Sequence, residues 1–273
     1  GFTSEAAAAT VAASPLILHW LEQKSFLQLD QSHRYTMHTM VRQYAEEIFH
    51  AADTALIAAA QQRHSHYYLT LVSTQEIRLH GAESQAAVTL VRQELLNIQS
   101  AWRWALAHRQ LPDLAQASTG LAHFYQMAGL VLEGNTDFAL AAEVAQAMLT
   151  PSALAAEPEL VGAVAKLLCA CAQLLFALGE DQTVMVTTQQ VIDLTASGRF
   201  PEFAAIAFCY QGKVLVRQGN PVTAREHFAT ALALATKAAP LTQIELQFEL
   251  ENLALSTTRH DEARSWYDTA LAA

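Results

Sequence analysis

The stretch Phe208–Leu232 reads FCYQGKVLVRQGNPVTAREHFATAL and contains two helix-forming runs separated by Gly219. Small residues stand at Gly212 in the first run and at Ala224 in the second, and Phe228 follows one turn after Ala224. Small residues let two helices approach closely, and an aromatic ring fills the groove that they leave. The stretch therefore predicts two helices packed against each other.

Glycines that close a helix recur along the C-terminal half of the chain. Gly129, Gly179 and Gly219 are spaced by 50 residues (129 to 179) and 40 residues (179 to 219). Further matches lie 39 residues apart: Ala224 and Ala263, Phe228 and Tyr267, and Ala231-Leu232 and Ala270-Leu271. A period near 40 with two helices per unit is typical of a helical solenoid.

The N-terminal part has a different pattern. Residues 4–13 predict a helix, and Ser14-Pro15 is the start signal of a second helix. Two short alternating runs, 25–29 and 34–37, surround a polar turn and predict a β-hairpin. Met40, Tyr44 and Ile48 then recur every fourth residue, which predicts a further helix. Helix, helix, hairpin, helix is the order of the later part of a winged-helix domain.

Two long helical patterns follow, at residues 53–80 and 84–109, and Gly81 separates them. Leu111-Pro112-Asp113 breaks the pattern before the repeats begin. The chain is therefore predicted to be all-α apart from the hairpin. The predicted domains are 1–52, the end of a winged-helix domain; 53–112, a helical arm; and 113–273, an α-solenoid.

The unit around Gly212, Gly219, Ala224 and Phe228 resembles a tetratricopeptide repeat. The other units are degenerate, because Thr258 stands where a turn glycine is expected, and Val184 and Thr188 replace the alanine and the aromatic residue. This resemblance implies a superhelix whose concave side, lined by the first helix of each pair, binds a ligand or a partner.

The N-terminal string Lys24-Ser25-Phe26-Leu27 … Arg34-Tyr35-Thr36-Met37-His38-Thr39-Met40-Val41-Arg42-Gln43-Tyr44-Ala45 is similar to the winged-helix end of the nucleotide-binding module in STAND-type signal-transduction ATPases. A Met-His-Asp-like motif opens the last helix in that family; Met37-His38 matches it, and Thr39 replaces the acid. The resemblance implies that His38 contacts the ADP phosphate in an intact parent protein. ADP or ATP would be the nucleotide of that parent, and not of the present chain.

Together the two resemblances imply the sensor and arm region of a STAND regulator. Its repeats would bind an inducer, a protein or a small molecule, and would help to hold the upstream ATPase module autoinhibited until the parent oligomerises on activation. A stand-alone tetratricopeptide scaffold is the alternative. An enzyme and a DNA-binding winged helix are weaker alternatives. Gly1-Phe2-Thr3 leads straight into a helical pattern, so we expect a piece of a longer protein.

Charge and composition restrict the partners. The formal net charge is −10, from 16 Lys and Arg against 26 Asp and Glu, and no basic run offsets it. We therefore expect neither nucleic-acid nor membrane binding, and no uninterrupted apolar run reaches the roughly 20 residues that a bilayer requires. The three cysteines, Cys169, Cys171 and Cys209, form no disulfide framework and predict buried thiols of a cytoplasmic protein.

The sequence lacks the common motifs for phosphate binding, metal binding and nucleophilic catalysis. The Gly-Lys pair Gly212-Lys213 is followed by Val214, so it is no phosphate loop. The sequence holds no His-Glu-x-x-His, Cys-x-x-Cys or Gly-x-Ser-x-Gly motif. We predict no catalytic residue and no metal site.

The candidate ligand-binding residues face away from the small packing positions of the first helices. They are His123, Gln173, Lys213 and Asn252, with Cys209 and Arg217 one turn either side of Lys213. A lysine and an arginine in an acidic chain suit an anionic group on the inducer. Plain solvation of each side chain is the simpler interpretation.

Overall fold

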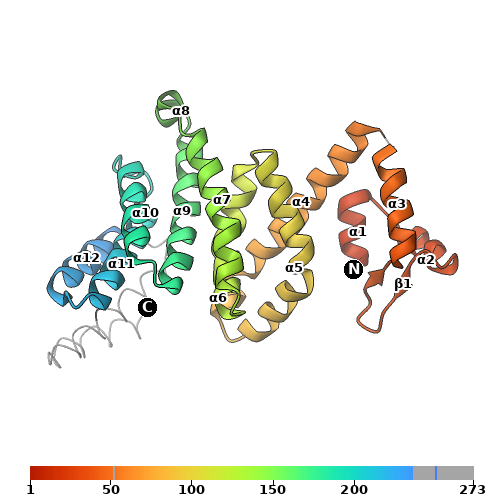
Figure 1. Cartoon of the computed structure of the whole chain (residues 1–273), viewed down its shortest axis with the longest axis horizontal. Helices are drawn as coiled ribbons and strands as arrows, with labels where there is room; N and C mark the ends of the chain where they lie inside the picture. The colour runs from red at the N-terminus through yellow and green to blue at the C-terminus, as the bar shows by residue number, and fades with distance from the viewer. Residues whose placement is uncertain (52, 236–249, 251–273) are drawn as a thin grey trace. The chain divides into compact units, whose positions relative to one another are not determined.

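The computed structural model describes residues 1–51, 53–235 and 250 of the chain. Figure 1 shows that the described part is built almost entirely of helices, with one small β-hairpin. The chain divides into two compact units, residues 1–120 and 121–273. The fold is all-α, as the sequence predicted.

The first unit follows the predicted order of elements: helix, helix, hairpin, helix and then two long helices. The elements are α1 (Ser4–Val11), α2 (Pro15–Gln23), β1 (Gln28–Leu29), β2 (Tyr35–Thr36), α3 (Thr39–Ala51), α4 (Thr54–His80) and α5 (Ser84–Ala107). Side-chain oxygens cap the N-termini of α2 and α4. Ser14 accepts the N–H of Ile17 ahead of Pro15, and Asp53 accepts the N–H of Ala55.

The hairpin is short and gains a third partner that the sequence pattern did not reveal. Gln28 pairs with Thr36 and Leu29 with Tyr35 in antiparallel register. Phe2 bridges to Tyr35 on the other side, and the two rings stack with centroids 5.7 Å apart. The N-terminal residues therefore belong to the same small subassembly as the hairpin.

The arm helices α4 and α5 form a packed hairpin joined at Gly81. Their contact surface buries large side chains with almost no exposure: Leu69, Val72 and Leu79 from α4, and Val91, Ile98 and Trp102 from α5. These positions recur at three- and four-residue spacing, which places them on one stripe of each helix. The predicted segments 1–52 and 53–112 both lie inside the first unit. The division between the units falls within α6 (Leu111–Met127), between Gly120 and Leu121.

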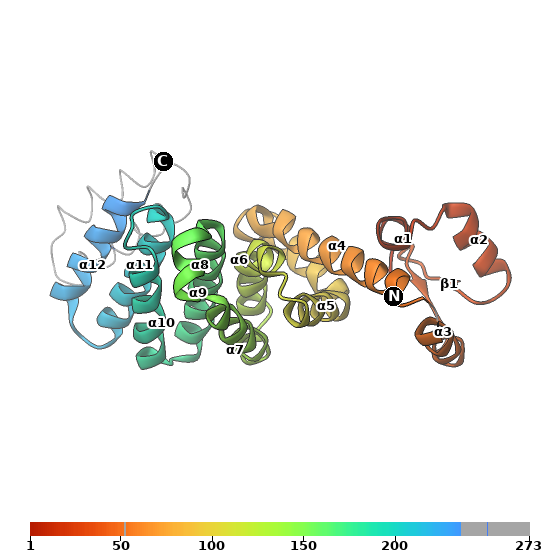
Figure 2. The same cartoon turned by 90° about the horizontal axis from the view of Figure 1, so that it is seen from above.

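The second unit is a series of helix pairs. Its helices are the end of α6, α7 (Val131–Met148), α8 (Pro151–Ala156), α9 (Pro158–Leu178), α10 (Asp181–Leu194), α11 (Pro201–Arg217) and α12 (Pro221–Leu234). Figure 2 shows α9, α10, α11 and α12 side by side, with α9 in contact with α7, α10 and α11. The pairs α6–α7, α9–α10 and α11–α12 are joined by short turns, which make the two members antiparallel neighbours.

The predicted turn glycines have the conformation that a helix end favours. Gly129, Gly179 and Gly219 have φ angles of 72°, 83° and 75°, in the left-handed region that a residue with a Cβ rarely adopts. The spacing of 50 residues between the first two has a structural cause. The extra short helix α8 lies between α7 and α9, and the sequence analysis did not predict it.

The helices of a pair can pack closely because a glycine, which has no side chain, lies at their contact. A Cβ at Gly212 on α11 would lie 2.5 Å from the ring of Phe228 on α12. Phe228 is fully buried beside Ala224, Ala231 and Cys209. The first pair reverses this arrangement, because a Cβ at Gly134 on α7 would lie 2.5 Å from the ring of Tyr125 on α6. The predicted role of the small residues and the aromatic ring is confirmed for the α11–α12 pair.

Helix α9 is unusually apolar. By length and composition it is apolar enough to cross a bilayer, with a mean hydropathy of 2.0 over an 18-residue window, although Lys166 interrupts the apolar run. Within the structure 61% of that window is buried. The helix occupies the centre of the second unit between α7, α10 and α11, and such a core position also explains its composition.

Candidate functional site

The first helices of the repeat pairs share a polar strip, made of Gln126, Gln173, Phe176, Tyr210, Lys213 and Arg217. It begins with two amides that bond to each other. The Nε2 of Gln173 on α9 donates to the Oε1 of Gln126 on α6 at 2.7 Å. The Nε2 of Gln126 donates in return to the backbone oxygen of Gln173 at 3.3 Å. The two helices are thereby fixed side by side through their half-buried polar faces.

The strip continues from α9 to α11 through aromatic rings and cations. The rings of Phe176 and Tyr210 meet edge to face, with centroids 5.8 Å apart. The Nζ of Lys213 lies 5.0 Å from the centre of the Tyr210 ring, and the Cζ of Arg217 lies 4.1 Å from the centre of the Phe176 ring. Each ring thus carries one cation, which its negative face attracts.

Arg217 is further held by contacts across the pair boundary. It donates to the backbone oxygen of Phe176 at 3.1 Å and forms an ion pair with Asp181, the first residue of α10. Asp181 stands in the first turn of its helix, where the helix dipole favours a negative charge. Arg217 is therefore oriented along the strip, while the exposed ion pair contributes little to stability.

The strip combines several kinds of chemical group. Amide donors and acceptors lie beside two aromatic faces and two cations, and cations of this kind form charge-assisted hydrogen bonds with anionic groups. The structure brings together three predicted residues, Gln173, Lys213 and Arg217. His123 lies on α6 one turn before Gln126 and is half-buried, with contacts of its own. Asn252 lies outside the residues that the structure describes.

Three members of the strip were not predicted from the sequence: Gln126, Phe176 and Tyr210. Each stands three residues from a predicted one: Gln126 after His123, Phe176 after Gln173, and Tyr210 before Lys213. Neighbours at that spacing share a face of a helix. A rule that extended every candidate by one turn in both directions would have found all three.

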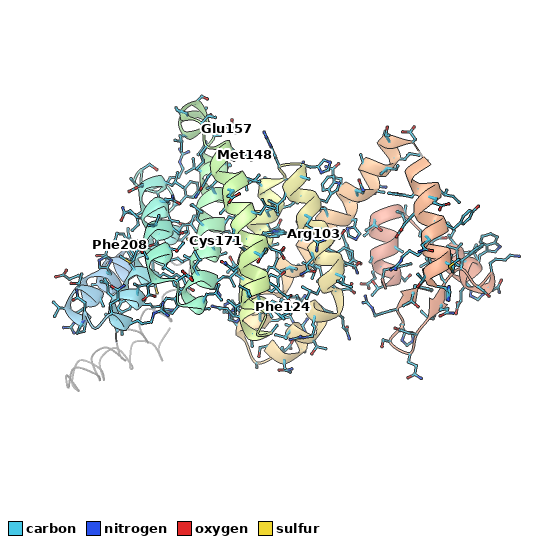
Figure 3. All side chains as sticks on the ribbon, in the orientation of Figure 1. Arg103, Phe124, Met148, Glu157, Cys171 and Phe208 are labelled. Atoms are coloured by element: carbon cyan, nitrogen blue, oxygen red, sulfur yellow. The ribbon has the colours of Figure 1, made fainter. Side chains whose placement is uncertain are left out.

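Cys209 is a correction. It is 2% exposed and packs against the cluster of Ala224, Phe228, Ala231 and Leu250, so it faces the partner helix and not a ligand. Cys169 and Cys171 are buried too, as predicted. Figure 3 labels Cys171, whose thiol lies 3.5 Å from the backbone oxygen of Phe138 on α7. Burial raises the pKa of the Cys171 thiol to about 12, and it raises that of Cys169 as well.

The three thiols are therefore expected to be inert in the folded protein. Only a thiolate reacts with a disulfide reagent, and burial suppresses both ionisation and access. With a thiol reagent at pH 8, we expect no fast reaction in buffer and all three cysteines to react in denaturant. Fast modification of one cysteine in buffer would contradict the packing described for that residue.

His38 occupies the start of α3. Its backbone oxygen accepts the N–H of Arg42 at 2.9 Å, and its Nδ1 accepts the N–H of Met40 at 3.3 Å. Because Nδ1 is an acceptor, the neutral imidazole carries its proton on Nε2. The exposed ring therefore caps the helix with one nitrogen and offers a donor with the other, beside the positive end of the helix dipole.

A separate groove runs along α4 in the first unit. It has a volume of about 730 Å³, lies between α1 and the start of α5, and contains none of the predicted site residues. Its arginines are engaged within the chain: Arg63 donates to the backbone oxygen of Thr10, and Arg78 bonds to Gln75 and Glu83. In the part of the chain that the structure describes, no three His, Cys, Asp or Glu side chains gather as metal ligands.

Comparisons with known proteins give a distant structural likeness. No protein-family model matches the chain, and no curated protein matches it. Among solved structures, a crystal structure of a Signal Transduction ATPase with Numerous Domains (STAND) protein with a tetratricopeptide repeat sensor, from Pyrococcus horikoshii, aligns with 98% of this chain at 14% identity and a TM-score of 0.32. The chain spans 47% of the length of that protein. A TM-score at this level does not establish a shared arrangement of the elements.

Proposed function

We propose that this chain is the sensor and arm region of a STAND signal-transduction ATPase, whose repeats bind an inducer and whose N-terminal segment is the end of a winged-helix domain. The observation that carries the proposal is the polar strip on the first helices of successive repeat pairs. A continuous row of amides, rings and cations over α6, α9 and α11 is what a repeat protein uses to recognise an extended partner.

The strip also restricts the class of inducer. Lys213 and Arg217 are cations in a chain whose net charge is −10, so they favour an anionic group within an otherwise polar partner. Phe176 and Tyr210 add flat apolar area beside those charges. We expect an acidic segment of a protein, or an acidic small molecule with an apolar body, in the cytoplasm.

The N-terminal segment supports a neighbouring module in the same chain. Large apolar side chains on α2 and α3 are 50–76% exposed: Leu16, Ile17, Trp20, Met40, Tyr44 and Ile48. Exposed apolar residues in such number mark an interaction surface. The upstream nucleotide-binding module is the occupant that we propose, and the exposed Nε2 of His38 would then face the ADP phosphate of the resting parent. A stand-alone scaffold gives no reason for these exposed residues.

Recognition of an anionic inducer can be tested on the chain itself. We expect synthetic decapeptides rich in Asp and Glu to bind more tightly than neutral peptides of matched hydropathy. Lys213→Met keeps the alkyl stem over Tyr210 and removes the charge. Loss of one charge-assisted contact should weaken the acidic peptides about 10-fold or more, as measured by fluorescence anisotropy.

Arg199→Met is the control, because Arg199 is an exposed cation between α10 and α11 that lies outside the strip. The affinity of the Arg199→Met variant for acidic peptides should equal that of the wild-type chain. Equal affinity of the wild-type chain for acidic and neutral peptides would contradict recognition of an anionic group by the strip. An equal loss of affinity for acidic peptides in Lys213→Met and Arg199→Met would contradict it as well.

A further inference from the structure

A buried ion pair joins two segments that are far apart in the sequence. Arg34, just before β2, donates to the carboxylate of Glu94 on α5, and their side chains are only 14% and 5% exposed. The same guanidinium donates to the backbone oxygen of Gly1 at 2.9 Å. One contact thus links the hairpin, the N-terminal residues and the arm.

Further polar groups complete the cluster around Glu94. Asn97 donates to Glu94 at 2.7 Å and to the backbone oxygen of Gly1 at 3.0 Å. The rings of His64 and Tyr68 are tilted against each other with centroids 4.7 Å apart, and both groups lie in the field of the Glu94 charge. Burial lowers the pKa of His64 and raises that of Tyr68, so both are neutral beside the pair at pH 7.

In the described residues, the N-terminal segment, residues 1–37, is held to the arm through polar contacts and small side chains. Its own core consists of Ala7, Leu18 and Leu27, with partly buried neighbours from within the segment. A further attachment is α1, whose small side chains lie against α4 and whose Thr10 backbone oxygen accepts a bond from Arg63 at 2.6 Å. The side chain of Thr3, just before α1, also hydrogen-bonds to Tyr67 on α4. Small side chains bury little apolar area, so a charged contact carries an unusual share of the attachment.

We propose that the Arg34–Glu94 pair is a latch: it holds residues 1–37 on the arm hairpin, and its opening detaches that segment while α4 and α5 stay packed. Breaking one partner of a buried pair leaves an uncompensated charge, which water must solvate, and detachment is the movement that lets water in. In the parent, and resting on the function proposed above, the latch would couple the arm to the segment that carries His38.

The experiment uses the chain as described, with hydroxyl-radical footprinting of two side chains. Tyr68 is 2% exposed beside the pair, and Trp102 is 1% exposed in the arm hairpin. In Glu94→Ala, and separately in Arg34→Ala, we expect Tyr68 to be labelled about 10- to 150-fold faster, as for the loss of one charge-assisted hydrogen bond. Trp102 should keep its wild-type rate.

Two further variants separate the latch from general stability. The double variant should label Tyr68 no faster than either single variant, because the two side chains act as one unit. Glu83→Ala removes the exposed Arg78–Glu83 pair and should change neither rate. The latch would be overturned if the single variants raised the labelling rates of Tyr68 and Trp102 equally. It would also be overturned if the double variant raised the labelling rate of Tyr68 by the product of the two single effects.

The coupling between the latch and signalling is tested by a separate measurement, the rate of ADP release from the parent protein that carries Glu94→Ala. Faster labelling of Tyr68 together with faster ADP release supports the coupling. Faster labelling with unchanged ADP release overturns the coupling and leaves the latch in place. The two parts of the inference can therefore fail separately.

Discussion

Replacing Phe228 by alanine should lower the free energy of unfolding of the second unit by about 3–5 kcal/mol. The ring is fully buried and fills the space that Gly212 leaves open on the facing helix. Alanine removes the ring and leaves a cavity beside Ala224 and Ala231, whose side chains are too short to fill it. The loss combines the hydrophobic transfer term with the cavity term.

Urea unfolding followed by circular dichroism measures this effect. Val222→Ala on the same helix is the control, because Val222 is 72% exposed, and it should change the unfolding free energy by less than about 0.5 kcal/mol. A loss below about 1 kcal/mol for Phe228→Ala would mean that the α11–α12 pair does not depend on this ring for its packing.

In the intact parent protein, His38→Ala should speed ADP release about 10- to 150-fold, which corresponds to the loss of one charge-assisted hydrogen bond. It should also raise activity without inducer, because a change of this size equals a typical allosteric coupling energy. The imidazole offers Nε2–H at the start of α3, while Nδ1 is occupied by the N–H of Met40. The isolated chain should stay folded in this variant.

A second substitution separates phosphate binding from helix capping. Serine is a good capping residue, so His38→Ser should preserve α3 while removing the ring donor. We expect ADP release to be as fast as in His38→Ala. His19→Ala, an exposed histidine on α2, is the control and should release ADP at the wild-type rate. A wild-type rate in His38→Ser would reduce His38 to a capping residue.

Local signals predicted most of the fold. The start of α2 follows from Ser14 and Pro15, and the ends of α6, α9 and α11 follow from glycines that can adopt a positive φ. These are short-range effects that a few neighbouring residues determine. The helix α8 was not predicted, because six residues are too few to show the hydrophobic periodicity of a helix.

The face of a helix was harder to predict than its ends. Cys209 was placed beside Lys213 because the two are four residues apart, but four residues turn the helix by about 40° past a full turn. That rotation carries Cys209 to the side of Ala224 and Phe228. Tyr210, three residues from Lys213, is offset to the other side and lies on the strip.

Contacts across long stretches of sequence could not be predicted from one chain. Arg34 and Glu94 are 60 residues apart, and each is an ordinary charged residue in its own local pattern. The pairing arises only when the hairpin docks on α5. The bridge between Phe2 and Tyr35 is of the same kind. Tertiary packing, and not local propensity, decides both.

The nucleotide content of the parent protein tests the central claim most directly. The protein is expressed with the sequence that precedes Gly1 in its reading frame, purified without added nucleotide, denatured, and its released nucleotides are measured by chromatography. The proposed function predicts a Gly-x-x-x-x-Gly-Lys-Ser/Thr loop in that upstream sequence and about one bound ADP per chain. An upstream sequence without such a loop, and a protein that releases no nucleotide, would contradict it.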